Sequence, residues 1–255
     1  MALPDRSMLG EINVFSREDG SGTRSEFESL TGTSSKGTDG IALSTEEMIQ
    51  AVAADSDAIG YIAYSSAAGS DDIKVISIDG VEPDGTTIKN SKYPLCRNYY
   101  LAYQDDISEL AQDFLRYAEG AGQRIVSGYC IPVNDESTFL SDKSSGRLII
   151  SGSSSMAPII EDLAEAYMEL NPNADIEVDV TDSSSGLNTA IRGECDIAMS
   201  SRELKEYEEE LLNKTALGKD AISVIVNKAN PVTGLSKDQI KGIYDKKWES
   251  WSDIK

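Results

Sequence analysis

The stretch "RLIISGSSSMAPIIEDLAEAYMEL" (147–170) decides the fold class, because a turn of glycine and serines joins a strand pattern to a helix pattern. "RLIIS" is an apolar run of strand length, and the residues after the turn repeat their apolar positions at helical spacing. The same alternation recurs along the chain, for example before and after the helix pattern "STEEMIQAVAAD" (44–55). Alternating strands and helices predict an α/β fold with mainly parallel sheets.

The composition excludes several classes of protein. The 255 residues include 44 acids and 23 bases, a formal net charge of −21, which argues against a nucleic-acid binder because such a protein needs a basic face. The chain has no histidine, which removes His-based triads and most transition-metal sites. The longest apolar runs are of strand length, so no membrane span is predicted. We expect no catalytic residues, no cofactor and no metal.

Four strand-to-helix turns share one design, in which small hydroxyl residues precede a helix. The first amides of a helix have no intrahelical partner and carry partial positive charge, so such turns bind anions. A serine before a helix is most often just an N-cap, and this explains any one of the turns better than an anion site does. Four such turns with one arginine predict a site for a small oxyanion. The turns are "REDGSGTRSEF" (17–27), "IISGSSSMAPII" (149–160), "VDVTDSSSGLNTAI" (178–191) and "DIAMSSREL" (196–204).

At these motifs the chain resembles the phosphate-binding proteins of bacterial phosphate ABC transporters (PstS type). The resemblance covers nearly all of residues 11–130 and 147–255. It rests on "INVFSREDGSGTRSEF", "GSSSM", "NPNADIEVDVTDSSSGLNTAIRGECDIAMSSREL" and "DAISVIVNKANPVTGLSKDQIKGIYDKKWESWSDI".

The resemblance implies a two-lobed periplasmic-binding-protein (type II) fold that closes on its ligand. Lobe I would be residues 92–217, and lobe II would be residues 1–91 with 218–255. The implied ligand is inorganic phosphate, bound in the cleft between the lobes, and the implied partner is a membrane permease of the ABC type. The implied location is extracellular or periplasmic, although the chain shows no export signal or lipid-anchor cysteine.

The resemblance also carries a ligand set onto this chain. Asp19 would fix the Arg17 guanidinium, Gly20 would allow the tight turn, and Arg202 would either add positive charge or pair with an acid such as Glu206. The direct phosphate ligands would be Ser154, Ser155, Ser183 and Ser201 from one lobe, and Arg17, Ser21, Gly22 and Thr23 from the other.

The identity of the anion stays open. Some family members have an aspartate at the position of Ser201, where it accepts the proton of hydrogen phosphate. Without that carboxylate, sulfate or molybdate is an alternative ligand. A hydrolase with a serine nucleophile is a weaker alternative, because "DGSGT" does not match G-x-S-x-G and no histidine can act as base.

The order of the segments differs from the family pattern. In the family "GSSSM" begins the mature protein and "REDGSGTR" follows "WSDI", whereas here residues 131–146 join the family's C-terminal part to its N-terminal part. The sequence therefore predicts a circular permutant, either natural or an engineered scaffold that binds phosphate without transport. A fragment of two tandem copies would read identically.

Two further questions stay open. One is whether lobes are exchanged between protomers, and the other is the role of residues 1–10, which resemble an expression tag.

The three cysteines, Cys96, Cys130 and Cys195, are far apart in sequence and have no metal-type spacing. We expect unpaired, buried thiols. A Cys96–Cys130 disulfide is the alternative in an oxidising compartment.

Overall fold

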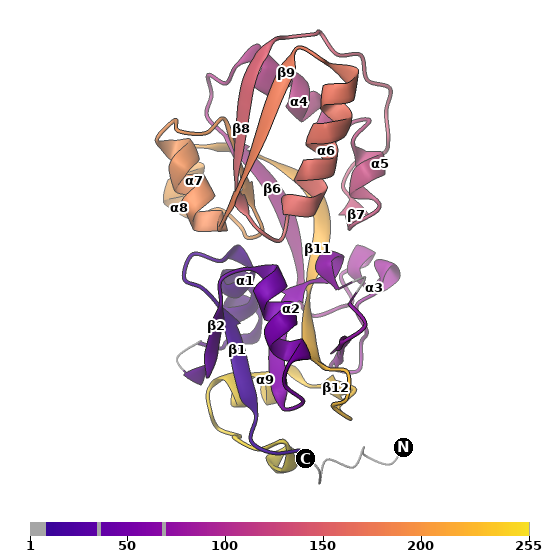
Figure 1. Cartoon of the computed structure of the whole chain (residues 1–255), viewed down its shortest axis with the longest axis vertical. Coiled ribbons are helices and arrows are strands. Elements are labelled where there is room, and N and C mark those ends of the chain that lie inside the picture. Colours follow the sequence, from indigo (N-terminus) through magenta and orange to yellow (C-terminus); the bar gives the residue numbers. More distant parts are fainter. Residues whose placement is uncertain (1–8, 35–36, 68–69, 255) are drawn as a thin grey trace. The chain divides into compact units, whose positions relative to one another are not determined.

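The computed structural model describes residues 9–34, 37–67 and 70–254, so most of the unassigned N-terminal stretch lies outside the described residues. The chain divides into two compact units (Figure 1). Unit 1 comprises the described residues of Met1–Asp19, Thr23–Cys96 and Ala221–Lys255. Unit 2 comprises Gly20–Gly22 and Arg97–Asp220.

Unit 1 is built on parallel strands covered by helices. Its elements are β1 (Asn13–Arg17), α1 (Gly22–Thr31, whose first residue clusters with unit 2), β2 (Gly40–Ala42), α2 (Thr45–Ala53), β3 (Ala58–Ala63), η2 (Tyr64–Ser66), β4 (Ile73–Val75), β5 (Ser77–Ile78), α3 (Gly85–Lys89), β12 (Gly234–Leu235), α9 (Lys237–Tyr244) and η3 (Trp251–Asp253). Strand β1 pairs in parallel with both β2 and β3. Strand β11 (Asn213–Asn227) pairs antiparallel with β3 and β4.

Helix α2 confirms the helix that the sequence predicts over 44–55. Its N-cap is Ser44, whose side chain accepts a hydrogen bond from the Glu47 amide, and this satisfies one of the free amides of the first turn. Met48 and Val52, one turn apart, are fully buried in a cluster with Ile62 and Ile225 of the neighbouring strands. The apolar stripe of the helix therefore covers β3 and β11.

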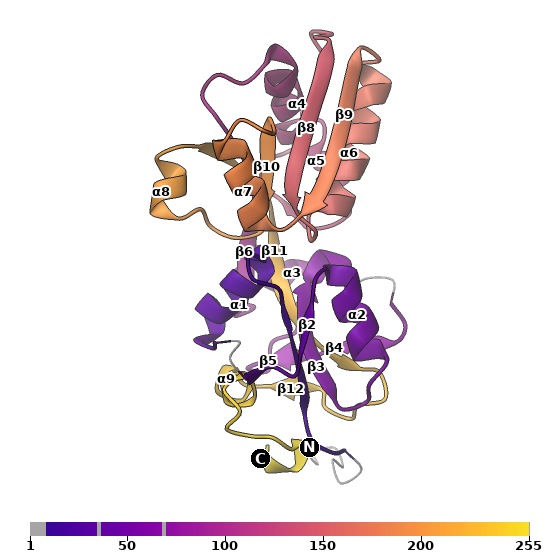
Figure 2. The same cartoon turned by 60° about the vertical axis from the view of Figure 1, so that its left-hand side comes forward.

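Unit 2 has the same plan. Its elements are β6 (Cys96–Tyr103), α4 (Glu109–Glu119), α5 (Gln123–Val126), β7 (Ile131–Pro132), β8 (Gly146–Ser153), α6 (Ala157–Leu170), β9 (Ala174–Thr181), α7 (Ser183–Ile191), β10 (Ile197–Ser200), α8 (Glu206–Glu209) and the first part of β11. The strand order is β6-β10-β8-β9, with β8 parallel to β9 and β10, and β6 antiparallel to β10. Figure 2 shows β8, β9 and β10 side by side. The predicted α/β fold with mainly parallel pairing is confirmed.

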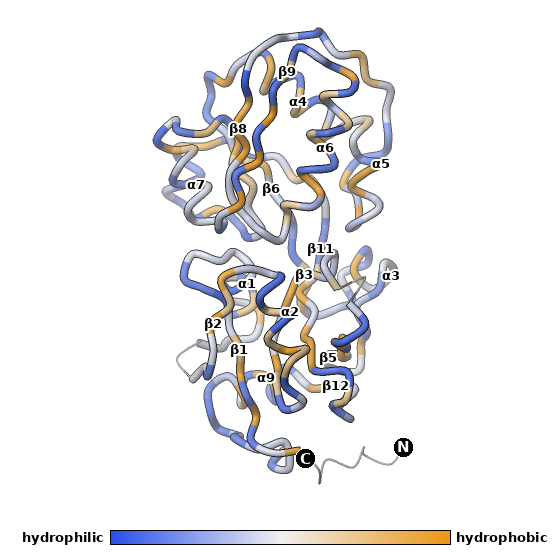
Figure 3. Tube along the Cα trace, in the orientation of Figure 1, coloured by the Kyte–Doolittle hydropathy of each residue, from blue (hydrophilic) through white to orange (hydrophobic). Residues whose placement is uncertain are grey.

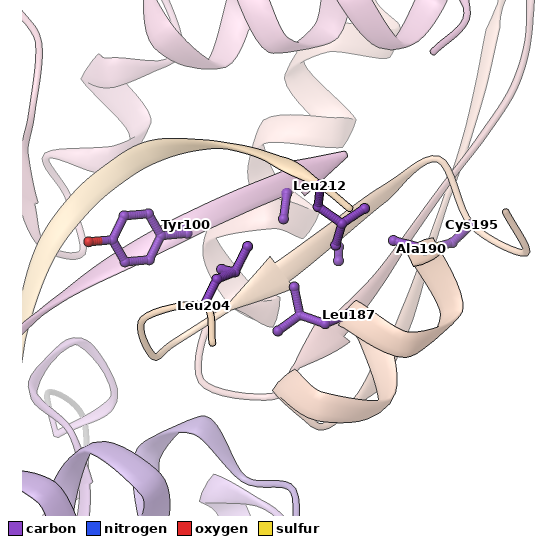
Figure 4. Packing of buried hydrophobic residues seen from close by; sticks show 8 residues of the cluster. Tyr100, Leu187, Ala190, Cys195, Leu204 and Leu212 are labelled. Carbon is purple, nitrogen blue, oxygen red and sulfur yellow. The ribbon is translucent and has the colours of Figure 1, made fainter. Parts of the chain in front are cut away.

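Helix α7 packs on one face of this sheet. Leu187 and Ala190 project from the helix into a buried cluster with Tyr100, Leu204 and Leu212 (Figure 4). Ile149 of β8 packs against this cluster, and because successive strand residues point to opposite faces, the buried Leu148 and Ile150 lie on the other face of the sheet. The two faces together fix β8 and β10, whose C-terminal ends carry serine turns.

The linker predicted at 131–146 is tied to the surface of unit 2. Strand β7 pairs with β11, and the following residues run beside α4 and α6. The fully buried carboxylate of Asp113 on α4 accepts hydrogen bonds at 2.7 Å from the hydroxyls of both Ser141 and Tyr167. The Phe139 ring lies 5.3 Å from that of Tyr117, centroid to centroid. The segment is therefore an anchored strap, which we call the linker strap.

Strands β6 and β11 each contain residues of both units, since Cys96 and Ala221 belong to unit 1 while Arg97 and Asp220 belong to unit 2. Figure 3 shows apolar residues along the strands of both units, including β3 and β8.

Within residues 9–34, 37–67 and 70–254, every helix is too short or too polar to cross a membrane.

None of the three cysteines forms a disulfide, so the alternative of a Cys96–Cys130 bridge is not what the structure contains. Burial raises the pKa of the Cys195 thiol to about 11, and burial also raises the pKa of Cys130. A thiol with a raised pKa is mostly protonated at neutral pH and therefore unreactive.

Candidate anion-binding site

Three serine hydroxyls of unit 2 lie together at the C-terminal ends of β8 and β10 and at the start of α7. Ser153 Oγ donates to Ser201 Oγ at 2.9 Å, and Ser183 Oγ lies 3.3 Å from Ser201 Oγ. The Ser201 amide also donates to Ser183 Oγ at 3.1 Å. All three side chains are buried. We call Ser153, Ser183 and Ser201 the serine cluster.

The cluster forms because the C-terminal ends of parallel strands lie at the same edge of a sheet. Strands β8 and β10 are neighbours, so the turns that follow them meet at this edge. Strand β9 lies beyond β8 and leads through the N-cap Asp182 into α7, which brings Ser183 to the same place. The Asp182 side chain accepts from the Ser185 amide at 2.9 Å and so caps the helix.

The structure brings together two of the four serines predicted in this unit, Ser183 and Ser201, and adds Ser153. The other two predicted serines follow Ser153 in the turn: Ser154 is half-buried and Ser155 is buried. The triple serine marks the turn in the sequence. Which of its hydroxyls points to Ser201 depends on where β8 ends, and the sequence does not show this.

Residues Gly20–Gly22 of the "REDGSGTR" turn cluster with unit 2 and lie against the serine cluster. The Ser184 amide of the first turn of α7 donates to the Gly20 carbonyl at 3.2 Å. A Cβ atom on Gly22 would lie 2.3 Å from Ser183 Oγ and 2.7 Å from Ser201 Oγ, so only glycine fits there. Gly20 has φ of +94°, which supports its predicted role in the tight turn. Ser21 is buried between these glycines.

In unit 1, Arg17 ends β1 and its side chain is buried. Its Nε and Nη2 donate to the two carboxylate oxygens of Glu18, both at 2.8 Å, and Nη1 donates to Thr45 Oγ1 at 3.3 Å. Two parallel hydrogen bonds to one carboxylate fix the plane of the guanidinium. Thr23, the remaining predicted ligand, is buried near the start of α1.

The prediction that Asp19 fixes Arg17 needs correction, since the carboxylate on Arg17 is that of Glu18. Asp19 instead forms an ion pair with Arg24 at 2.6 Å, and its side chain is 97% exposed. The reason is that Arg17 points into the unit, whereas Asp19 lies in the turn beyond the strand end and faces solvent.

Arg202 forms an ion pair, but its partner is Glu208 and not the predicted Glu206. Its Nη1 and Nη2 atoms donate to the Glu208 carboxylate at 2.7 and 2.8 Å, and both side chains are buried. Nη2 also donates to Ser184 Oγ at 3.1 Å. Helix α8 begins at Glu206, which is exposed, and its turn points Glu208 inward.

A phenol next to Arg17 is held neutral. Tyr61 OH lies 2.7 Å from Ser16 Oγ and accepts a hydrogen bond from the Arg17 amide at 3.2 Å. Burial raises the pKa of Tyr61 to about 12. The group therefore adds no negative charge beside Arg17 at neutral pH.

The chemistry of this arrangement suits an oxyanion. A hydroxyl both donates and accepts, and Ser201 Oγ already accepts from Ser153, so its own proton is available to Ser183 or to a bound anion. The N-terminus of α7 adds partial positive charge. Among the described residues, no group of three or more Cys, Asp or Glu side chains is arranged to hold a metal ion.

Comparisons with known proteins decide the family. A family model described as a PBP superfamily domain matches residues 8–119 and 137–255. The phosphate-binding protein PstS 2 of Streptococcus agalactiae serotype V is 38% identical over 264 residues, which cover 97% of this chain and 89% of that protein. The chain belongs to the PstS family of the PBP superfamily. The resemblance stated from the sequence is thereby confirmed.

Other relatives agree with this assignment. PstS 2 of Streptococcus pneumoniae serotype 4 is 34% identical over 267 residues, covering 100% of this chain and 91% of that protein. The crystal structure of a phosphate-binding protein of a phosphate ABC transporter from S. pneumoniae TIGR4 matches with a TM-score of 0.76 and 35% identity, covering 96% of this chain and all of that one.

The alignments also bear on the order of the segments. Each streptococcal alignment runs through nearly the whole chain, so these PstS 2 proteins have their segments in the order found here. PstS of Bacillus subtilis aligns at 35% identity over only 126 residues, 48% of this chain and 41% of that protein. A permuted order relative to such members stays a prediction.

Proposed function

We propose that this PstS-family chain binds inorganic phosphate as the substrate-binding component of a phosphate ABC transporter. The serine cluster beside the N-terminus of α7 is the observation that carries the proposal, because it gathers buried hydroxyl and amide donors. Relatives of nearly the same length are named phosphate-binding proteins, which favours phosphate over sulfate or molybdate.

The proposed ligands are those expected from the sequence, with Ser153 added as the hydroxyl that orients Ser201. Unit 2 offers Ser154, Ser155, Ser183, Ser201, Ser21 and Gly22, and unit 1 offers Arg17 and Thr23. The Arg17 guanidinium supplies the formal positive charge, and Glu18 holds it in plane.

The proposed partner is a membrane permease that receives the phosphate, and the proposed location is outside the cytoplasmic membrane. Both follow from membership of the PstS family, whose pneumococcal member is described as part of a phosphate ABC transporter. An engineered permuted scaffold is not favoured, because natural streptococcal relatives align along the whole chain.

Calorimetric titration of a Ser201→Ala variant with phosphate tests the site. Removing the central hydroxyl of the cluster should weaken binding about tenfold or more, the effect of losing a hydrogen bond to a charged ligand. Ser223→Ala is the matched control: Ser223 is also fully buried, and its hydroxyl has no hydrogen-bond partner among the described residues. Equal phosphate affinity in the two variants would contradict the proposed site.

A further inference from the structure

A buried arginine lies beneath the serine turns of unit 2 without belonging to the predicted ligand set. Arg97 is the second residue of β6. Its Nε and Nη2 donate to Asp220 Oδ2 at 3.1 and 3.0 Å, and Nη1 donates to the Ser201 carbonyl at 3.2 Å. The guanidinium therefore joins a carboxylate on β11 to the turn that follows β10.

The same guanidinium also reaches the second serine turn. Arg97 Nη2 donates to Tyr99 OH at 3.2 Å, and the Tyr99 hydroxyl donates to the Ser155 carbonyl at 3.5 Å. The Arg97 Cζ atom lies 5.1 Å from the centre of the Tyr99 ring. Two predicted phosphate-binding residues, Ser155 and Ser201, thus have their carbonyls fixed by one buried network.

The cost of burying this ion pair argues that its geometry matters. Arg97 and Asp220 are both inaccessible to solvent, and taking two charges out of water offsets much of their attraction. The arginine fork, unlike a lysine ammonium, can serve Asp220, Ser201 and Tyr99 at fixed angles simultaneously. Arg97 and Asp220 also begin and end the long segment of unit 2, where β6 and β11 continue into unit 1.

We propose that Arg97, oriented by Asp220, is a positioning residue of the phosphate site, an inference that rests on the proposed function. By holding the Ser201 and Ser155 carbonyls, it sets the directions of the adjoining amides and hydroxyls before phosphate arrives. Preorganised donors lose less conformational freedom on binding, so fixing them raises affinity. Arg97 acts through the turns and does not itself contact phosphate.

Three variants test the proposal: Arg97→Lys, Asp220→Asn and Tyr99→Phe. Calorimetry should show phosphate binding weakened about tenfold in the first two and about threefold in the third, which removes the Tyr99 hydroxyl and with it the link from Arg97 to Ser155 but keeps the bond from Arg97 to Ser201. Asp113→Asn is the matched control, because it also damages the hydrogen bonds of a buried carboxylate in unit 2. That carboxylate anchors the linker strap and not the serine turns. This control should lose thermal stability and keep its phosphate affinity within about twofold of the parent.

Hydrogen exchange of peptides covering 151–156 and 199–203 is the second readout. In both peptides, the amides of Arg97→Lys and Asp220→Asn should exchange faster than those of Asp113→Asn. This difference should persist where the variants have lost the same number of degrees of melting temperature. Parent-like phosphate affinity in folded Arg97→Lys and Asp220→Asn would overturn the proposal. If Arg97→Lys fails to fold, Asp220→Asn and Tyr99→Phe decide. If the parent protein binds no phosphate, the proposed function fails. Unchanged hydrogen exchange in Arg97→Lys and Asp220→Asn would in that case overturn the positioning role as well.

Discussion

At Arg17 the sequence points to a residue but not to the carboxylate that holds it, which is Glu18. An arginine at the end of a strand, followed by small residues, indicates an anion site from the sequence alone. Two acids follow it, however, and only the direction of the chain after β1 determines that Glu18 faces the guanidinium while Asp19 faces solvent. Ser153 was missed for a similar reason, since the end of β8 selects one hydroxyl of three.

The assignment of Glu18 gives a prediction at the residue scale. Glu18→Gln should lower the free energy of unfolding by about 2 kcal/mol, because it replaces the carboxylate that accepts two hydrogen bonds from the buried Arg17 guanidinium. Asp19→Asn should change it by less than about 0.5 kcal/mol, since Asp19 is exposed. Urea unfolding of both variants measures the difference. A larger loss in Asp19→Asn than in Glu18→Gln would restore the original assignment.

At the scale of elements, much of the structure was predictable. The helix over 44–55 follows from local signals and is confirmed, since α2 spans Thr45–Ala53 with Ser44 as its N-cap. The order of the family-like segments likewise indicated a linker at 131–146. Its anchoring was not predictable, because it depends on Asp113 and Tyr167, which lie far from it in sequence.

The linker strap therefore gives a prediction at the element scale. Asp113→Asn should weaken the hydrogen bonds from Ser141 and Tyr167 and lower the free energy of unfolding by about 2 kcal/mol. Limited proteolysis with mass spectrometry should then find faster cleavage within 133–146, while exposed loops elsewhere are cut at the parent rate. Unchanged cleavage of this segment would show that the strap is held by other contacts.

At the scale of the whole molecule, the fold class followed from the strand–turn–helix alternation of many residues, and the family followed from the resemblance of the quoted motif segments to PstS-type proteins. The net charge of −21 gave no sign of an anion site, since it is a sum over the surface. The donors of the proposed site are local: buried hydroxyls, the start of α7 and Arg17. Segment order is also a whole-chain property, and the streptococcal relatives share it.

The buried tyrosines predict how stability depends on pH. Burial raises the pKa of Tyr61 to about 12 and that of Tyr244 well above its ordinary value, so folding favours the neutral phenols. This stability is fully present below the unfolded pKa of about 10 and is lost as pH rises toward 12, at about 1.4 kcal/mol per pH unit for each phenol. Unfolding by urea between pH 8 and 11.5 measures the loss. A flat profile, or one unchanged in Tyr61→Phe, would contradict this account.

The most direct test of the account is a calorimetric titration of the unmodified chain with phosphate, after bound ligand has been removed by unfolding and refolding, with sulfate as competitor. The account predicts a single phosphate site that excess sulfate does not occupy. Selectivity then rests on serine oxygens that accept the phosphate proton, because Ser201 stands where some members have an aspartate. Absence of phosphate binding, or equal binding of sulfate, would contradict the central claim that the serine turns and Arg17 form a phosphate site.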